Sequence, residues 1–293
     1  MSVRRGAAAP SHGGALLGVH VAVLLFGFAG LFGKWLQLAP SVIVFGRTAV
    51  ASIALAVLLR GAGERRGRFE WRFAVNGAVL ALHWVAFFQA IQTATVAVAL
   101  LGFASFPLFV LLLEASMLHR PLRVGEWTTA ALVTAGLLLL VPEFRLENRT
   151  VQGLLWGIVS GFSFALLAVC NKALTARRTA GEIAFWQNAC AAICLLPAAV
   201  FARELPDAQS LALLVVLGVV CTALAHTLFI RSLRALSAHT ASIVAALEPV
   251  YGIALAFALL GETPSARTLA GGALIVGAAL LATIRASRQR AAE

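Results

Sequence analysis

The chain has 293 residues, of which 61% are hydrophobic and only 12% are Asp, Glu, Lys or Arg. This charged share is about half of the roughly 25% that soluble domains carry. A mean hydropathy of +0.92 excludes a soluble globular protein, because the apolar surface is too large to bury in one core. The net charge of +11 does not indicate nucleic-acid binding, since the basic residues lie almost entirely in short gaps between apolar runs.

Ten apolar runs are each long enough to cross about 30 Å of hydrocarbon as a helix. In the first half of the chain they cover residues 15–32, 41–59, 73–91, 95–117 and 124–141. In the second half they cover residues 152–171, 183–201, 210–230, 238–260 and 267–284. We therefore predict an all-α polytopic membrane protein with ten transmembrane helices. Residues 1–146 and 147–293 are expected to form two five-helix repeats within one integral membrane domain.

The distribution of Lys and Arg predicts the orientation of these spans. Of the 23 Lys and Arg residues, 17 lie on the side of the two termini and five on the other side, while Arg47 lies inside the second span. Positively charged loops stay in the cytoplasm. Both termini are therefore expected to be cytoplasmic, in a bacterial inner membrane.

The two halves resemble each other at an offset of about 140 residues. The matching residues are Gly14 with Gly153, Gly18 with Gly157, Lys34 with Lys172, Arg47 with Asn188, and Pro107 with Pro249. Because each half has an odd number of spans, the repeats are inverted, a common construction of secondary transporters. The matched prolines indicate either hinges beside a central binding site or tolerated kinks, and the glycines are typical of close helix packing.

Few ionisable residues lie deep in the spans, and each costs about 2.5 to 3.5 kcal/mol to insert, so each is a candidate functional residue. Glu248 and His83 both lie about ten residues from the cytoplasmic ends of their spans, roughly 15 Å deep. Together with Trp84 they are expected to form a substrate or proton site at mid-membrane. The alternative is that Glu248 bonds the backbone freed by Pro107 and that His83 is an ordinary core residue.

Three further residues extend this candidate site. Arg47 lies too deep for a simple interface anchor, so it either snorkels outward or faces a water-filled cavity. Phe87 follows His83 by one helical turn and is expected to give the cavity an aromatic wall. Tyr251 follows Glu248 by three positions, so it is expected to line the same cavity.

Other polar residues lie nearer the ends of the spans. Trp186, Gln187 and Asn188 are expected to line an inner vestibule, since Asn188 matches Arg47 in the other repeat. For Asn171 and His226, near the cytoplasmic ends of their spans, simple solvation is the favoured explanation.

No sequence pattern supports an enzyme. G-x-S-x-G, H-E-x-x-H, paired intramembrane aspartates and a Walker-type phosphate loop are all missing from the chain. The four cysteines lie inside apolar runs and are expected to be small buried side chains rather than disulfide or metal ligands. We expect no catalytic residue, no metal and no organic cofactor, and the expected partners are the lipid bilayer and a small-molecule substrate.

The segment AALEPVY at residues 245–251 is followed by LLGETP at 259–264 and by Gly271, Gly272 and Gly277. This pattern resembles the second-repeat signature of EamA-type transporters in the drug/metabolite transporter superfamily. The resemblance implies ten helices in a basket around a central cavity, with the fifth and tenth spans peripheral, and export of metabolites such as amino acids.

The first-repeat counterpart runs from Phe106-Pro107-Leu108 through His119-Arg120-Pro121 to Gly136 and is a weaker match. Within the family an acidic residue often precedes the second proline, where this chain has His119-Arg120, so no role of that acid is carried over. The size of the chain and its Asn171-Lys172 pair are similar to YddG-like amino-acid exporters.

These observations predict an alternating-access secondary transporter that exports small metabolites, most of all amino acids, including hydrophobic or aromatic ones. Glu248 would accept the ammonium of a zwitterion, while Arg47 or a backbone donor would meet its carboxylate. The alternative is efflux of drugs or nucleosides, which needs no fixed carboxylate partner. An intramembrane enzyme and a structural membrane subunit are remote alternatives. Coupling to protons and facilitated diffusion both remain open.

Overall fold

The computed structural model describes residues 10–61, 68–117, 124–141, 145–202 and 205–290, and all regular secondary structure within these ranges is helical. Eight helical segments are long and apolar enough to cross a membrane, and two shorter apolar stretches lie at Val124–Leu140 and Ala266–Ala278. The prediction of ten spans in an all-α membrane protein is therefore confirmed. The segment His119–Pro121 of the family resemblance lies outside the described residues.

The helices of the first half begin and end close to the expected edges. They are α1 (His12–Trp35), α2 (Pro40–Gly61), α3 (Trp71–Thr93), α4 (Val96–Phe103) with α5 (Phe106–Met117), and α6 (Val124–Leu140). Polar residues mark several starts, because a side-chain oxygen there satisfies a free amide of the first turn. Ser11 accepts from the amide of Gly14, and Thr95 accepts from the amide of Val98.

The helices of the second half follow the same plan. They are α7 (Arg149–Leu174), α8 (Ala180–Ala202), α9 (Ala208–Gly218) with the π-helical segment η1 (Val219–Leu224) and α10 (Ala225–Ser232), α11 (Ala238–Ala245) with α12 (Glu248–Leu260), and α13 (Ala266–Arg290). Asn148, Asp207 and Ser237 cap α7, α9 and α11 with their side chains.

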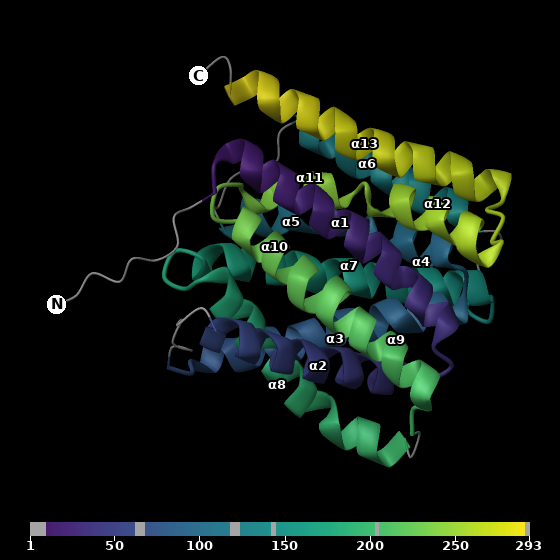
Figure 1. Cartoon of the computed structure of the whole chain (residues 1–293). Helices are drawn as coiled ribbons and strands as arrows, with labels where there is room; N and C mark the ends of the chain where they lie inside the picture. Colours follow the sequence, from purple (N-terminus) through teal and green to yellow (C-terminus); the bar gives the residue numbers. More distant parts are fainter. Residues whose placement is uncertain (1–9, 62–67, 118–123, 142–144, 203–204, 291–293) are drawn as a thin grey trace.

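The packing of the helices follows the inversion of the repeats. Helix α1 packs against α10 and α12, while α7, its counterpart, packs against α3 and α4. The first span of each half thus contacts the third and fourth spans of the other half. The pair α2 and α8 and the pair α6 and α13 lie at opposite edges of the bundle (Figure 1).

Glycines bring the central helices close together. A Cβ atom on Gly102 of α4 would lie 3.1 Å from Cα of Gly157 in α7. A Cβ atom on Gly27 of α1 would lie 3.0 Å from the backbone N of Gly252 in α12. These two crossings join equivalent spans in the inverted repeats, and small residues at both allow the backbones to touch. For Gly157 the structure confirms the expectation of close helix packing.

The fourth and ninth spans are both interrupted. The break in the fourth span lies at Ala104 and Ser105, and the break in the ninth lies at Ala246 and Leu247. Pro107 and Pro249 therefore do not kink continuous helices, but lie in the first turns of α5 and α12, where a missing N–H removes no helical hydrogen bond. Matching broken helices in the two halves are typical of transporters.

The start of α1 and the end of α13 lie on the same face of the bundle (Figure 1). We call this face, which also contains the end of α7 and the start of α3, the terminal face. The other face contains the end of α1 and the start of α7, and we call it the opposite face.

Candidate functional site

A small cavity lies at the centre of the bundle, between the two repeats. Its volume is about 20 Å³, enough for a water molecule but not for a metabolite. It is lined by Phe26, Ala29, Arg47, His83, Trp84, Phe87, Phe103, Phe164, His226 and Glu248. None of these residues is more than 8% exposed, so the cavity is closed toward both faces.

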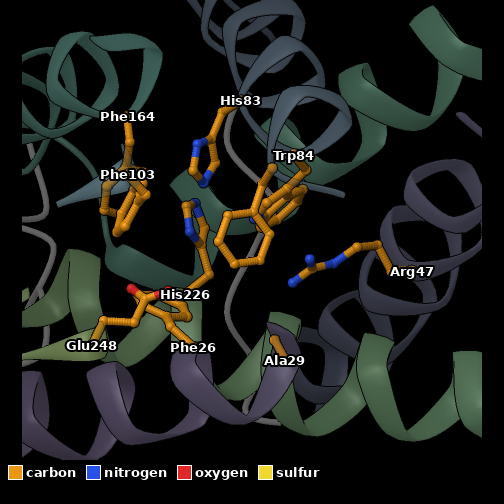
Figure 2. A pocket seen from close by; sticks show the side chains of 10 residues that line it. Phe26, Ala29, Arg47, His83, Trp84, Phe103, Phe164, His226 and Glu248 are labelled. Atoms are coloured by element: carbon orange, nitrogen blue, oxygen red, sulfur yellow. The ribbon is translucent and has the colours of Figure 1, made fainter. Parts of the chain in front are cut away.

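Arg47 of α2 enters this cavity from one side (Figure 2). Its Nε donates to Oγ1 of Thr222 over 2.9 Å, and its Nη2 lies 3.4 Å from the carbonyl oxygen of Cys221. Both acceptors belong to η1, where the π-helical turn interrupts the regular hydrogen bonding, as such turns often do at functional sites. The guanidinium also lies over the ring of Trp84. Arg47 is buried and faces the cavity, so the outward-snorkelling alternative is wrong.

His83 of α3 is held by the neighbouring α7. Its Nδ1 lies 2.9 Å from Oγ of Ser160 and 3.0 Å from the carbonyl oxygen of the same residue. Its ring stacks on Phe164, with centroids 4.7 Å apart. His83 therefore has the partners expected of a core residue and also lines the cavity, so the two interpretations of this residue do not exclude each other.

Glu248 is the first residue of α12, directly after the break in the ninth span. It enters the cavity from the side opposite Arg47, with His226 between them (Figure 2). Its Oε2 has no hydrogen-bond partner among the described residues, so this oxygen does not bond the backbone around Pro107. A buried carboxylate oxygen that borders a cavity without a partner is a ready acceptor for a ligand donor.

His226 of α10 is a cavity residue that sequence reasoning missed. It is fully buried, its Nε2 lies 3.0 Å from Oε1 of Gln187, and Gln187 donates in turn to Oδ1 of Asn171. The expectation that Asn171 and His226 are solvated is wrong, because both are buried and are joined through Gln187 by hydrogen bonds between α7, α8 and α10. In the sequence, the only indication that His226 lies in the cavity is that it is a polar residue within an apolar run.

The remaining wall of the cavity is aromatic. Phe87 lies there as expected, and Phe26, Phe103 and Phe164 join it from three other helices. The rings of Phe103 and Phe164 are 5.5 Å apart, and those of Phe26 and Phe164 are 6.1 Å apart. Edge and tilted contacts of this kind order the rings into one apolar surface.

Four sequence-based candidates do not line the cavity. Tyr251 is half-buried and packs against Gly27 of α1. Trp186 stacks on Phe73 in a separate apolar cluster. Gln187 lies behind His226, and Asn188 donates to the carbonyl oxygen of Ala184 in its own helix.

Lys34 and Lys172 are the only lysines in the chain. On the opposite face, Lys34 Nζ donates to the carbonyl oxygen of Ala94 over 2.7 Å. On the terminal face, Lys172 Nζ donates to the carbonyl oxygens of Leu233 and Leu236 over 2.7 and 2.8 Å. Each lysine therefore joins the end of the first span to the end of the third span in its own repeat, where free helix carbonyls attract a cation.

Further polar contacts close the two faces. On the opposite face Oε2 of Glu262 accepts from the amide of Val96, and Arg149 donates to the carbonyl oxygen of Thr93. On the terminal face Arg178 donates to Glu182 over 2.7 Å and also to Glu70. The hydrogen bond from Arg178 holds the pKa of Glu70 below its usual range.

The described residues contain no cluster of three or more His, Cys, Asp or Glu side chains that would hold a metal ion. The four cysteines are free. Cys221 is buried as expected and Cys170 and Cys190 are half-buried, but Cys194 is exposed, so the expectation of burial is wrong for that residue. An outward-facing thiol is small and apolar enough to face lipid.

Two segments, residues 13–141 and 151–284, match the profile of the EamA-like transporter family. The chain is 30% identical to the pseudopaline exporter CntI of Pseudomonas aeruginosa over 81% of this chain and 84% of that protein. It is 27% identical to the S-adenosylmethionine uptake transporter of Rickettsia prowazekii over 86% of this chain and 80% of that protein. A crystal structure with 22% sequence identity superposes with a TM-score of 0.72, over 95% of this chain and 99% of that chain, and has the same fold.

Proposed function

Because the chain belongs to the EamA-like transporter family, we propose that it exports amino acids, including hydrophobic or aromatic ones, by alternating access across a bacterial inner membrane. One observation carries this proposal. Arg47 and the unpartnered carboxylate oxygen of Glu248 reach the same aromatic cavity from opposite sides, at the interface of the two repeats.

An amino acid complements this cavity in charge. Its ammonium matches the free acceptor of Glu248, and its carboxylate matches the planar guanidinium of Arg47. The zwitterion is neutral overall, so it adds no net charge to the membrane interior while it satisfies two groups that are costly to leave unpaired there. The aromatic wall formed by Phe87, Phe103 and Phe164 receives an apolar side chain.

Transport requires the closed cavity to open toward one face at a time. The breaks in the fourth and ninth spans favour such a movement, because backbone hydrogen bonds are already interrupted there. Pro107 and Pro249 start the helices that follow these breaks and are the proposed hinges. Lys34 and Lys172 are the proposed latches, one on each face.

The terminal face is proposed to be cytoplasmic. The support for this orientation is the excess of Lys and Arg on the side of the termini, where 17 of the 23 such residues lie. In this orientation Lys172 and Arg178 close the cytoplasmic face, and Lys34 closes the periplasmic face.

A second candidate substrate class is a nucleoside-bearing amino acid, favoured by the relatives named as S-adenosylmethionine uptake transporters. Such a molecule retains the α-amino carboxylate that Glu248 and Arg47 would bind. Its aromatic base would stack on the rings of the cavity wall. Drugs or nucleosides without an amino acid group would contact only the aromatic wall, and their transport would not depend on Glu248.

The proposal is tested by counterflow in proteoliposomes. Purified protein is reconstituted with a saturating mixture of unlabelled amino acids inside, and the uptake of individual labelled amino acids is followed. We expect accumulation that requires the internal substrate and that falls at least about tenfold in Glu248→Gln, because a charge-assisted hydrogen bond is lost. The matched control is Glu147→Gln, since Glu147 is exposed in the loop before α7.

Two results would contradict the proposal. Undiminished counterflow in Glu248→Gln would show that Glu248 does not bind the ammonium group of the substrate. Counterflow of nucleosides or drugs, but of no amino acid, in folded protein replaces amino-acid export with the alternative substrate class.

A further inference from the structure

A second cavity, of about 420 Å³, lies at the terminal face between α3 and α7. It shares no lining residue with the central cavity. Arg72 at the start of α3 and Arg177 and Arg178 just after α7 surround it, together with Trp71 and Asn76. It is therefore a separate cavity from the central one.

The charges around this second cavity favour an anion. Arg178 is paired with Glu70 and Glu182. Arg72 and Arg177 form no ion pair within the described part of the chain. Glu70 also lines the cavity, and besides the hydrogen bond from Arg178 the charges of Arg72 and Arg177 help to lower its pKa. The three arginines still outnumber this one carboxylate, and guanidinium groups bind phosphate oxygens in a bidentate manner.

A polar residue in the wall of the second cavity also has a side-chain atom without a partner among the described residues. The side chain of Asn76 is 95% buried, and its Nδ2 has no hydrogen-bond acceptor among the described residues. A buried amide donor without an acceptor is rare in a folded protein. Asn76, Arg72 and Arg177 all offer donors, so the complementary ligand is rich in acceptor oxygens, as a phosphodiester is.

The outer side of the second cavity is apolar and exposed. Trp71 is 69% exposed and Val75 is 49% exposed on α3. Further toward the membrane centre, Leu82 on α3 and Phe162 on α7 are also exposed. An apolar surface thus runs from the arginines into the hydrocarbon region, next to a tryptophan at the depth where interfacial tryptophans lie.

We propose that the second cavity binds an anionic phospholipid from the leaflet at the terminal face. Arg72, Arg177 and Asn76 hold the phosphate, while the acyl chains lie along Val75, Leu82 and Phe162. Basic pockets between transmembrane helices recognise lipid head groups by this combination of charge and apolar surface. A soluble phosphate ester matches the arginines but leaves the apolar surface uncovered.

The test is native mass spectrometry of the full-length protein with phosphatidylglycerol, phosphatidylcholine, glycerol 3-phosphate or inorganic phosphate. The variant Arg72→Gln/Arg177→Gln is compared with Arg60→Gln/Arg231→Gln, which loses the same charge from exposed positions on the same face. We expect phosphatidylglycerol to bind wild type and control alike and to bind the first variant at least about tenfold more weakly. Asn76→Leu is also expected to weaken the binding of phosphatidylglycerol.

Three results would overturn this proposal. Equal phosphatidylglycerol binding by both double variants shows a general surface charge effect. Equal binding of phosphatidylcholine shows that the anionic head group is not recognised. Binding of glycerol 3-phosphate or phosphate as tight as that of phosphatidylglycerol assigns the cavity to a soluble anion. Mass spectrometry counts lipids on folded protein only, so a poorly folding variant does not imitate any of these results.

Discussion

The guanidinium carbon of Arg47 lies 4.0 Å from the centre of the Trp84 ring, and both side chains are buried. A cation at this depth needs compensation, and the face of a tryptophan ring supplies it without a carboxylate. Thr222 accepts a hydrogen bond from the same guanidinium. These contacts do not use Oε2 of Glu248, which is without a hydrogen-bond partner among the described residues and so is available to a ligand.

Replacing Trp84 with Leu removes this ring. We expect Trp84→Leu to lose about 1 kcal/mol more stability than Trp84→Phe, since a desolvated cation–π contact is worth about 2 kcal/mol and Phe retains part of it. The measurement is the free energy of unfolding in detergent. The control is Trp127→Leu, because Trp127 is exposed on α6. Equal losses in the two Trp84 variants would disprove the contribution of the cation–π contact.

Arg47→Lys retains the charge but not the planar guanidinium. Its ammonium does not reproduce both the bond to Thr222 and a bidentate contact with a carboxylate. We expect the wild type to be inhibited in counterflow much more strongly by an amino acid than by the corresponding decarboxylated amine. In Arg47→Lys this preference should fall at least about tenfold. An unchanged preference would show that Arg47 does not recognise the carboxylate.

Lys34 and Lys172 should control access to the central cavity from opposite faces of the bundle. A reporter variant has the four native cysteines replaced by serine and Ala29→Cys in the central cavity. We expect Lys34→Met to increase labelling of this cysteine by an impermeant thiol reagent added at the opposite face, because the bond to Ala94 is lost. Lys172→Met should increase labelling from the terminal face, because the bonds to Leu233 and Leu236 are lost.

The arginine replacements Lys34→Arg and Lys172→Arg, which keep a donor, serve as controls. Increased labelling from the same face in both methionine variants would contradict the assignment of one latch to each face.

Gly157 should tolerate no added side chain. A Cβ atom there would lie 2.8 Å from the carbonyl oxygen of Ala99 and 3.0 Å from Cα of Gly102. We expect Gly157→Ala to destabilise the protein by about 1 to 3 kcal/mol through overpacking. Gly13→Ala is the control, because a Cβ atom at Gly13 meets nothing within 4 Å. The control should be neutral or more stable, and equal unfolding midpoints for both variants would contradict the close crossing of α4 and α7.

The bond between Glu70 and Arg178 should make stability depend on pH. The pKa of Glu70 is lowered in the folded protein, so its contribution is present above the unfolded pKa of about 4.3 and is lost as pH falls through the folded value. Wild type should therefore unfold at a higher temperature than Glu70→Gln at pH 7. The difference should shrink as pH falls below the unfolded pKa of about 4.3 and vanish below the folded pKa. Glu147→Gln is the control, and a difference that persists in acid would contradict this assignment.

Much of the fold can be predicted from hydropathy alone. The ten spans, their order and the matching positions of Pro107 and Pro249 follow from apolar runs and from an internal repeat. Lipid makes these signals strong, because each backbone polar group in hydrocarbon must be satisfied within its own helix. The depth of His83 and Glu248 follows in the same way, from counting residues along a helix of known rise.

Which side of each helix faces the centre was decided only by the tertiary structure. In a membrane bundle both the lipid-facing and the protein-facing sides of a helix are apolar, so Phe26, Phe103 and Phe164 carry no signal that separates them from other phenylalanines. The same limit explains why Tyr251 was expected in the cavity but packs against α1, whereas His226 was expected in solvent but lies in the cavity. Composition and periodicity determined that this chain crosses the membrane ten times in two inverted halves. Helix rotation, the breaks and the π-helical turn decided which side chains meet at its centre, because these depend on contacts between helices rather than on the polarity of any one of them.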